Sequence, residues 1–524
     1  MAETKRARAT VKPAQKTAKK TQQSELVKII EKETNNFPKS AKSDDPTVSP
    51  KHKILFVASE ARPFIATGGL ADVIGSLPQA LASDPTYDVR VVLPLYSDIK
   101  AEMRRKMTFH GNIYVPLSWR NQYCGVFSYV TGGVTFYFID NEYYFKRPGC
   151  YGYYDDGERF AFFSKSVLEI LPFIGFYPDL LHCHDWQAAL SSIYLKTIYR
   201  DRPEYQSIRA LFTIHNMEYQ GKFSLDILGD LFGIPNEYRD LVEYEGCINL
   251  MKGAIECSEK ISTVSPTYAK EIQTAQYAHG LHDIIGKNEW KLTGILNGID
   301  TASYDPATDP SLFSNYSASE LDNKKICKTE LQKMLGLPVK DVPMIAMITR
   351  LVAHKGLELT KTVAEDILHE DIQFVLLGTG DFAYEEYFKD LGKRYEGKAS
   401  VNIAFNNDLS RKIYSGADIF LMPSVSEPCG LSQMIASRYA TVPLVRETGG
   451  LYDSIKPYGA GGNGFTFASC NPYDMLYVIH EAIDTYKNGE AWKSLMQRAA
   501  TTDFSWSRSA EEYKKLYVNT ITMR

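Results

Sequence analysis

Charged and polar side chains lie beside glycines in several short segments of the chain, and each segment suits contact with a phosphorylated or hydroxylated ligand. Arg350 and Lys355 lie in the segment Arg350–Gly356, directly after an apolar run. An arginine can bind two phosphate oxygens at once and a lysine adds a point charge, so the pair suits a departing diphosphate. An exposed charged loop would show the same residues, and this segment alone does not decide between the two.

A glycine pair, Gly68 and Gly69, follows Thr67 and precedes apolar residues at helical spacing. Glycines let a backbone approach a ligand closely, and the first turn of a helix offers free N–H groups to an anion. The motif therefore suits a diphosphate or a sugar oxygen. A tight turn between a strand and a helix is the competing interpretation.

Two histidines, His182 and His184, precede Asp185 and Trp186 after a short apolar run. Polar residues at the carboxyl end of a strand are where α/β proteins place ligand contacts. A metal would need further ligands that the sequence does not provide here, so we expect no metal. Hydrogen bonding to a sugar is favoured over polar residues that only complete a strand end.

Two further segments repeat the combination of polar residues and glycines. Glu427-Pro428-Cys429-Gly430-Leu431 follows one apolar run, and Thr448-Gly449-Gly450-Leu451 follows the next. The Glu427 carboxylate suits ribose or sugar hydroxyls. Cys429 could be a nucleophile, but no sequence feature activates it, so packing or a backbone contact is favoured.

Short apolar runs separated by helical patterns position these segments. The predicted strands are Ile54–Ala58, Val89–Pro94, Ala210–Ile214, Lys260–Val264, Ile345–Ile348, Phe374–Leu377, Ile419–Met422 and Val442–Val445. Such alternation predicts an α/β protein with parallel sheets. The pattern starts twice, near residues 53 and 344, with a boundary near residue 297. We therefore predict two Rossmann-like domains that face a central cleft, with ligands at the carboxyl ends of the strands.

Composition agrees with an ordinary globular protein. The chain has 524 residues, 44% hydrophobic and 23% charged, with a net charge of −4. Its eight cysteines are scattered, so a disulfide framework or a structural zinc site is not expected. No apolar run approaches the ~20 residues that span a membrane, and no secretory signal is present. We expect a cytoplasmic protein without a membrane partner.

The first 52 residues differ from the rest. Residues 1–53 hold 13 Lys and Arg against 6 Asp and Glu, so the remainder carries a net charge of −11. An acidic body argues against a nucleic-acid partner. We predict a disordered basic extension over residues 1–52. A solubilising tail is favoured, with an electrostatic docking arm or a transit peptide to a plastid as the alternatives.

Taken together, the segments resemble bacterial glycogen synthases and plant starch synthases from about Lys53 to the C-terminus. The motifs that carry the resemblance are Thr-Gly-Gly-Leu-Ala-Asp-Val at 67–73, His-Asp-Trp at 184–186, Thr-Ile-His-Asn-Met-Glu-Tyr-Gln-Gly at 213–221, Thr-Val-Ser-Pro-Thr-Tyr-Ala at 263–269, Leu-Asn-Gly-Ile-Asp at 296–300, Glu-Pro-Cys-Gly-Leu at 427–431 and Arg-Glu-Thr-Gly-Gly-Leu at 446–451. Their number and order make the resemblance far more specific than any single motif.

The resemblance implies the GT-B fold and retaining transfer of glucose from ADP-glucose to the non-reducing end of an α-1,4-glucan. No cofactor and no metal are implied. The implied domains are a glucan-acceptor domain at 53–296, a nucleotide-sugar domain at 297–502 and a helix at 503–524 that crosses back to the first domain. The sequence implies no oligomeric state.

By motif matching, Arg350 and Lys355 would stabilise the departing ADP, Glu427 would lie near the donor sugar, and His184 would contact the glucose. The implied donor-binding residues are Thr67, Gly68, Gly69, Asn297, Cys429, Gly430, Leu431, Thr448, Gly449 and Gly450, and those lining the cleft are Glu60, Asp72 and Asp155.

Two positions depart from the family pattern. Ala66 stands where the family usually has a lysine, and Ser426 where it usually has an aromatic residue. An uncompensated loss of a cation near the donor phosphate would remove about 2–4 kcal/mol of transition-state stabilisation, which slows the reaction about 30- to 1000-fold. Lys53 or Arg62 is a candidate to compensate. The alternatives to an active glucan synthase are a weakly active or inactive paralogue that binds glucan or nucleotide, and a transferase with a different donor such as UDP-glucose.

Overall fold

The structure is a computed structural model that describes residues 51–523. The predicted basic extension, residues 1–52, lies outside the described residues except for Lys51 and His52. Within the described part, no helix is long and apolar enough to cross a membrane.

A nine-stranded sheet forms the first half, in the order β12-β11-β7-β6-β1-β2-β5-β4-β3. Its strands are β1 His52–Val57, β2 Tyr87–Pro94, β3 Thr108–Leu117, β4 Arg120–Thr131, β5 Val134–Asp140, β6 Leu180–His184, β7 Arg209–Ile214, β11 Lys260–Thr263 and β12 Leu292–Gly294. The pairs from β12 to β5 are parallel, whereas β4 pairs antiparallel with both β5 and β3. A small antiparallel sheet joins β8 Lys222–Phe223, β10 Cys247–Asn249 and β9 Glu243–Tyr244.

Helices connect and cover these strands. They are α2 Gly69–Ala82, α3 Ala101–Arg104, α4 Glu142–Phe145, α5 Asp156–Phe173, α6 Asp185–Lys196, α7 Ile227–Asp230, α8 Arg239–Val242, α9 Leu250–Cys257, α10 Pro266–Glu271 and α11 His282–Lys287, with short 3-10 turns at Pro203–Tyr205, Asn236–Tyr238 and Glu289–Lys291. In α2, the apolar residues at helical spacing are the buried ones, among them Leu70, Val73 and Leu77. This burial fixes which way the first turn of α2 faces.

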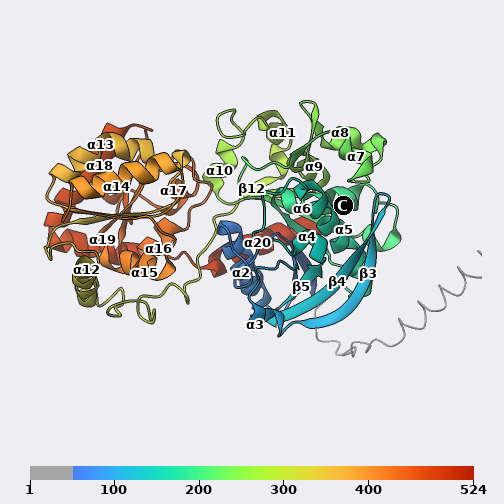
Figure 1. Cartoon of the computed structure of the whole chain (residues 1–524), viewed down its shortest axis with the longest axis horizontal. Helices are drawn as coiled ribbons and strands as arrows, with labels where there is room; N and C mark the ends of the chain where they lie inside the picture. The colour runs from blue at the N-terminus through green and yellow to red at the C-terminus, as the bar shows by residue number, and fades with distance from the viewer. Residues whose placement is uncertain (1–50, 524) are drawn as a thin grey trace, which may run out of the picture. The chain divides into compact units, whose positions relative to one another are not determined.

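A six-stranded parallel sheet forms the second half, in the order β15-β14-β13-β16-β17-β18. Its strands are β13 Met344–Ile348, β14 Gln373–Leu377, β15 Ala399–Asn402, β16 Ile419–Met422, β17 Val442–Arg446 and β18 Phe465–Phe467. Its helices are α12 Asp322–Met334, α13 Leu357–His369, α14 Phe382–Arg394, α15 Asn407–Gly416, α16 Ser432–Arg438, α17 Gly449–Ser454, α18 Pro472–Lys487 and α19 Gly489–Thr501, with 3-10 turns at Ala353–Lys355 and Tyr458–Ala460. Helices cover both faces of this sheet (Figure 1).

The last helix, α20 Trp506–Ile521, leaves the second half and packs against α2, β6 and β7 of the first (Figure 1). Tyr513 and Tyr517 on α20 are fully buried there. The predicted domain boundary near residue 297 falls between the last strand of the first sheet and the first strand of the second. The exact domain limits stay a prediction.

All eight predicted strands are present, with ends that differ by no more than two residues. The sequence did not reveal the antiparallel hairpin of β3 and β4. Its turn is formed by Ser118, at φ 54°, and Trp119, not by the Asn-Gly or Asp-Gly pair that usually marks a tight hairpin.

Candidate functional site

The carboxyl ends of strands from both sheets open onto one cavity of about 1000 Å³. Polar residues from both halves line it, and many of them belong to the predicted set. The predicted residues on its wall are Glu60, Thr67, Gly68, Gly69, Asp72, Asn297, Arg350, Lys355, Glu427, Cys429, Gly430 and Leu431. This is the position that the strand-end argument predicts for a ligand.

The first glycine loop leaves open space where a ligand can approach. A Cβ atom on Gly68 or Gly69 would meet no protein atom within 4 Å. Protein packing therefore does not explain the two glycines, whereas close approach of a ligand to the backbone does. Gly68 is the N-cap of α2 and no side chain caps this end, so the first N–H groups of the helix are available to an anion.

Glu60 holds this loop in place. Its carboxylate accepts hydrogen bonds from the Thr67 N–H, from Thr67 Oγ1 at 3.0 Å and from the Tyr151 hydroxyl at 3.1 Å. Burial raises the pKa of Glu60 above its usual value. The carboxylate shapes the loop, and Thr67 and the glycines face the cavity.

Two cations from the second half lie on the wall, Arg350 and Lys355. Lys355 Nζ lies 2.7 Å from Glu427 Oε2, which also accepts a hydrogen bond from Ser424 Oγ at 2.9 Å. Arg350 is exposed to the cavity and forms no ion pair within residues 51–523. An unpaired guanidinium at this place is available to an anionic ligand.

Asn297 and Cys429 lie where the two halves meet the cavity. The Asn297 side-chain oxygen is buried and has no hydrogen-bond partner among the described residues. Burial raises the pKa of the Cys429 thiol to about 12, although the Asn297 N–H lowers it somewhat. A protonated thiol is a poor nucleophile, which agrees with the packing role predicted for Cys429. Gly430 adopts φ 72°, a conformation that favours glycine.

His184, which we predicted to contact the glucose, lies behind another histidine. His184 is fully buried and does not line the cavity. Its Nδ1 lies 2.9 Å from Nε2 of His215, which does line the cavity. His215 is in the Thr-Ile-His-Asn segment, directly after β7, and this position at a strand end could have indicated from the sequence that it lines the cavity. Burial lowers the pKa of His184 well below its usual value and that of His215 to about 3.

Asp185 also lines the cavity; it belongs to the polar segment predicted at this strand end, although it was not among the predicted site residues. It adopts φ 57° at the end of β6, and its carboxylate accepts the His215 N–H at 2.8 Å. Burial raises its pKa to about 7. A positive φ is uncommon for a non-glycine residue, and in this conformation the Asp185 carboxylate reaches the His215 backbone.

The second Thr-Gly-Gly motif does not line the cavity, in contrast to its predicted donor contact. Thr448 Oγ1 and the Gly449 N–H donate to Glu271 Oε1 at 2.9 and 3.0 Å. A Cβ on Gly450 would lie 2.1 Å from the Cys429 carbonyl oxygen. These residues therefore lie behind the Glu427–Gly430 segment, because close backbone packing occupies the space that a ligand would need.

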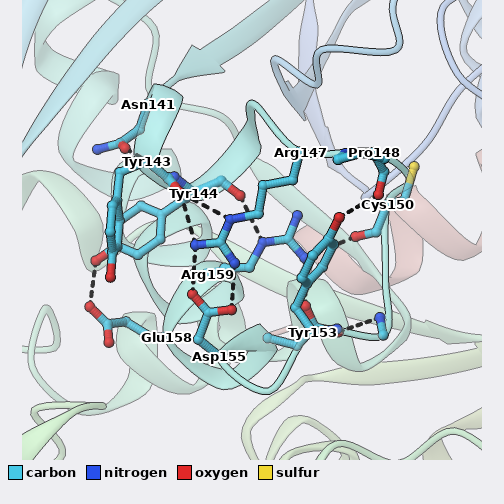
Figure 2. A network of polar contacts seen from close by, with 12 residues as sticks. Asn141, Tyr143, Tyr144, Arg147, Pro148, Cys150, Tyr153, Asp155, Glu158 and Arg159 are labelled. Atoms are coloured by element: carbon cyan, nitrogen blue, oxygen red, sulfur yellow. Dashed lines mark hydrogen bonds and ion pairs between the residues drawn. The ribbon is translucent and has the colours of Figure 1, made fainter.

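Asp155 likewise lies off the wall, whereas its neighbour Asp156 lines it. Asp155 forms two hydrogen bonds with Arg147, of 2.6 and 2.8 Å (Figure 2). Asp156 accepts from the Gly152 N–H at 2.8 Å and from Arg159 at 2.5 Å. Arg159 is fully buried and also donates to the carbonyl oxygen of Tyr144 at 2.8 Å. This network shapes the wall through Asp156.

The departure at Ala66 leaves a small side chain beside the glycine loop. Ala66 is exposed and directly precedes Thr67. Arg62 is committed to an ion pair with Asp72, with its Nε 2.6 Å from Oδ1. Lys53 is at the start of β1, the end of the strand away from the loop. Neither candidate therefore takes the place of the usual lysine with a free charge at the loop.

Two Rossmann-like sheets around one cavity, with an open glycine loop and a free arginine on its wall, define a glycosyltransferase of the GT-B class. The family model "Starch synthase catalytic domain" matches residues 53–287, and "Glycosyl transferases group 1" matches residues 329–498. The chain belongs to the glycogen synthase and starch synthase family, which confirms the resemblance seen in the motifs.

Relatives and solved structures support this membership along nearly the whole chain. Glycogen synthases from Desulforamulus reducens and Geobacillus stearothermophilus are 50% and 48% identical, over 89% of this chain and 98% and 97% of theirs. The catalytic domain of starch synthase IV from Arabidopsis thaliana, bound to ADP and acarbose, is 33% identical, with a TM-score of 0.84 over 91% of this chain and all of that one. A sucrose-phosphate synthase from Thermosynechococcus elongatus, 15% identical with a TM-score of 0.56 over 90% of this chain and 99% of that one, shares the fold.

Among residues 51–523, no group of three or more His, Cys, Asp or Glu side chains is arranged to hold a metal ion. None of the relatives reported above supports the alternative of an inactive regulatory paralogue.

Proposed function

We propose that this member of the glycogen synthase and starch synthase family transfers glucose from ADP-glucose to the non-reducing end of an α-1,4-glucan and retains the anomeric configuration. The observation that carries the proposal is the free Arg350 on the wall of the same cavity as the glycine loop and the Lys355–Glu427 pair. Negative charge develops on the diphosphate as the glycosidic bond breaks. Cations and N–H groups that are already in place stabilise that charge without reorganising.

The nucleoside is proposed to bind on the second half. Phe405 follows β15, lines the cavity and is 84% exposed. An exposed aromatic ring on a cavity wall suits stacking against a nucleobase, which contributes about 1–3 kcal/mol in other nucleotide sites. The ADP named in the starch synthase IV structure supports adenine as the base.

The acceptor is proposed to be a glucan chain that enters past the first half. The acarbose named in the same related structure supports an oligosaccharide ligand. In this chain, Tyr151, Trp186 and Tyr219 line the cavity. Aromatic faces and edges of this kind pack against the apolar faces of sugar rings, and Asp156 offers hydrogen-bond acceptors beside them.

Front-face attack by the acceptor hydroxyl is the mechanism that the wall supports. A double displacement needs a carboxylate that is free to attack the anomeric carbon. In the described residues, every carboxylate on the wall has a partner. Side chains bind four of them: Thr67 binds Glu60, Arg62 binds Asp72, Arg159 binds Asp156 and Lys355 binds Glu427. The other two, Asp185 and Asp300, accept hydrogen bonds from the backbone N–H groups of His215 and Ser303. We therefore propose that the leaving diphosphate assists departure of the acceptor proton.

The test is ADP release from ADP-glucose with glycogen as the acceptor, with UDP-glucose assayed in parallel. We expect glycogen-dependent ADP release and a clear preference for ADP-glucose. Tight binding of maltooligosaccharide without turnover of either donor would overturn the proposal. Faster turnover of UDP-glucose would overturn only the choice of donor. The anomeric configuration of the product, read by NMR, tests retention.

A further inference from the structure

Glu271, the last residue of α10 in the first half, reaches across to the second half. Its Oε1 accepts hydrogen bonds from Thr448 Oγ1 at 2.9 Å and from the Gly449 N–H at 3.0 Å. Its Oε2 is buried and has no hydrogen-bond partner among residues 51–523. Burial raises the pKa of this carboxyl above its usual value. Glu271 is half-buried, and burying one carboxylate oxygen without a hydrogen-bond partner costs free energy, so the position of this side chain needs an explanation.

The turn that Glu271 holds packs directly on the backbone of Glu427 and its neighbours. The Gly450 N–H donates to the carbonyl oxygens of Glu427 and Pro428, both at 3.2 Å. A Cβ on Gly449 would lie 2.0 Å from the Glu427 carbonyl oxygen. There is no free space between the turn and the Glu427 backbone, so a shift of one moves the other.

Two further residues of the first half support the same loop, which we define as residues 424–430: Ser265 contacts it directly, and Tyr277 acts through Arg446. Ser265 Oγ donates to the Pro428 carbonyl oxygen at 2.7 Å. The Tyr277 hydroxyl lies 3.4 Å from Arg446 Nη2, and Arg446 Nε donates to the Ser424 carbonyl oxygen at 2.8 Å. The first half therefore supports loop 424–430 at three points, and Glu271 is the charged one.

We propose that Glu271 is a positioning residue, which holds loop 424–430 so that the Glu427 carboxylate meets Lys355 at the donor site. It acts through the Thr448–Gly450 turn and does not touch the substrate, because it does not line the cavity. Contact between the two halves is thereby linked to the geometry of the reacting groups. The inference rests on the proposed function for its kinetic consequence, but the support of the loop is a separate property.

The kinetic test compares Glu271→Ala with Glu271→Gln. Alanine leaves the Gly449 N–H and the Thr448 hydroxyl without an acceptor, and we expect kcat to fall about tenfold, as for the loss of a buried hydrogen-bond acceptor. Glutamine keeps an acceptor oxygen, so we expect kcat to return to within about twofold of the original protein. The matched control is Thr267→Val, which removes a 2.7 Å hydrogen bond between Thr267 Oγ1 and Asp453 Oδ1. That bond joins the same two helices without contacting loop 424–430, and we expect it to leave kcat unchanged.

A second measurement separates positioning from general loosening and does not need turnover. Amide hydrogen exchange of loop 424–430 is expected to speed up in Glu271→Ala and not in Thr267→Val, with both proteins folded by circular dichroism. Equal exchange in the two variants, or equal losses of kcat, would overturn the inference. So would a glutamine variant as impaired as the alanine one. If the original protein released no ADP, the proposed function would fail while the exchange experiment still decided the role of Glu271.

Discussion

Lys355 and Glu427 form an ion pair on the cavity wall, with Nζ 2.7 Å from Oε2, and both side chains are largely buried. Such a pair is sensitive to the loss of one partner, because the remaining charge stays buried. It also fixes the direction in which the ammonium points, while Arg350 stays free for the ligand. The Lys355 ammonium and the free Arg350 guanidinium are the two cationic groups of the proposed donor site.

Replacing Glu427 by Gln should lower kcat by about 100- to 1000-fold, the cost of one preorganised group in a transition state. The amide keeps the size of the side chain but no longer holds the Lys355 charge. The measurement is glycogen-dependent ADP release at saturating ADP-glucose. The matched control is Glu358→Gln, which removes the partner of Lys361 in an exposed pair on α13 and should change kcat little. A Glu427→Gln protein with full activity would contradict the role of the pair.

Replacing Arg350 by Ala should weaken binding of ADP and lower kcat/KM, by about 100-fold or more. The guanidinium has no other ion-pair partner in the described part of the chain, so its charge is available to the diphosphate alone. Isothermal titration with ADP reports the binding directly. Arg394→Ala, which removes an exposed arginine paired with Asp390 on α14, is the control. Equal ADP affinity in the Arg350→Ala protein would place the diphosphate elsewhere.

Introducing the usual lysine with Ala66→Lys should raise the rate. Position 66 is exposed beside the glycine loop, and Arg62 is occupied by Asp72. A new cation there would meet the developing charge of the leaving group. Ala66→Met adds similar length without charge and should not raise the rate. An unchanged or lower rate in the lysine variant would indicate that the site has reorganised around alanine.

Stability should fall as the pH drops below about 6.5, because His182, His184 and His215 stay neutral in the fold. Burial lowers the pKa of His182 and His184 well below the usual value and that of His215 to about 3. The unfolded chain then binds protons that the folded chain excludes. Each such group contributes a slope of about 1.4 kcal/mol per pH unit between its two pKa values.

Urea unfolding at pH 7, 6 and 5 measures this slope. His182→Gln should reduce the slope of the free energy of unfolding against pH by the contribution of one histidine. This reduction is expected whether or not the substitution changes stability at pH 7. His480→Gln, at an exposed histidine next to Glu370, should leave the slope nearly as it is. The raised pKa of Asp185, about 7, acts with the opposite sign and is common to all three proteins. An identical slope in the His182→Gln protein would refute the explanation.

Chelation should leave the rate unchanged if side-chain cations neutralise the leaving diphosphate. Arg350 and Lys355 supply that charge in the proposed mechanism, in the role that a divalent ion has in other transferases. The measurement is ADP release after dialysis against EDTA, with and without added Mg²⁺ or Mn²⁺. A loss of activity that either ion restores would contradict the proposal.

Local patterns in the sequence determined eight of the strands and the first glycine loop. Short apolar runs such as Ile345–Ile348 are buried strands because a parallel sheet with helices on both faces excludes water from both sides. Gly68 and Gly69 face the cavity because a strand end and the first turn of a helix determine their position. Neither inference needed distant contacts, and the ordered motifs were sufficient to indicate the family.

Tertiary structure decided which polar side chains reach the cavity. Asp155 and Asp156 are neighbours in the sequence, but Arg147 holds the first away from the wall and Arg159 holds the second on it. Glu271 accepts hydrogen bonds from Thr448 and Gly449, although their Thr-Gly-Gly motif is the same as that of the first loop. His215 contacts His184 and lines the cavity, whereas His184 does not. Glu271 and His215 lie far along the chain from the groups they contact. Arg147 and Arg159 lie only eight and three residues from theirs, but which of the two adjacent carboxylates each arginine binds depends on the folded geometry of this segment and not on the spacing alone.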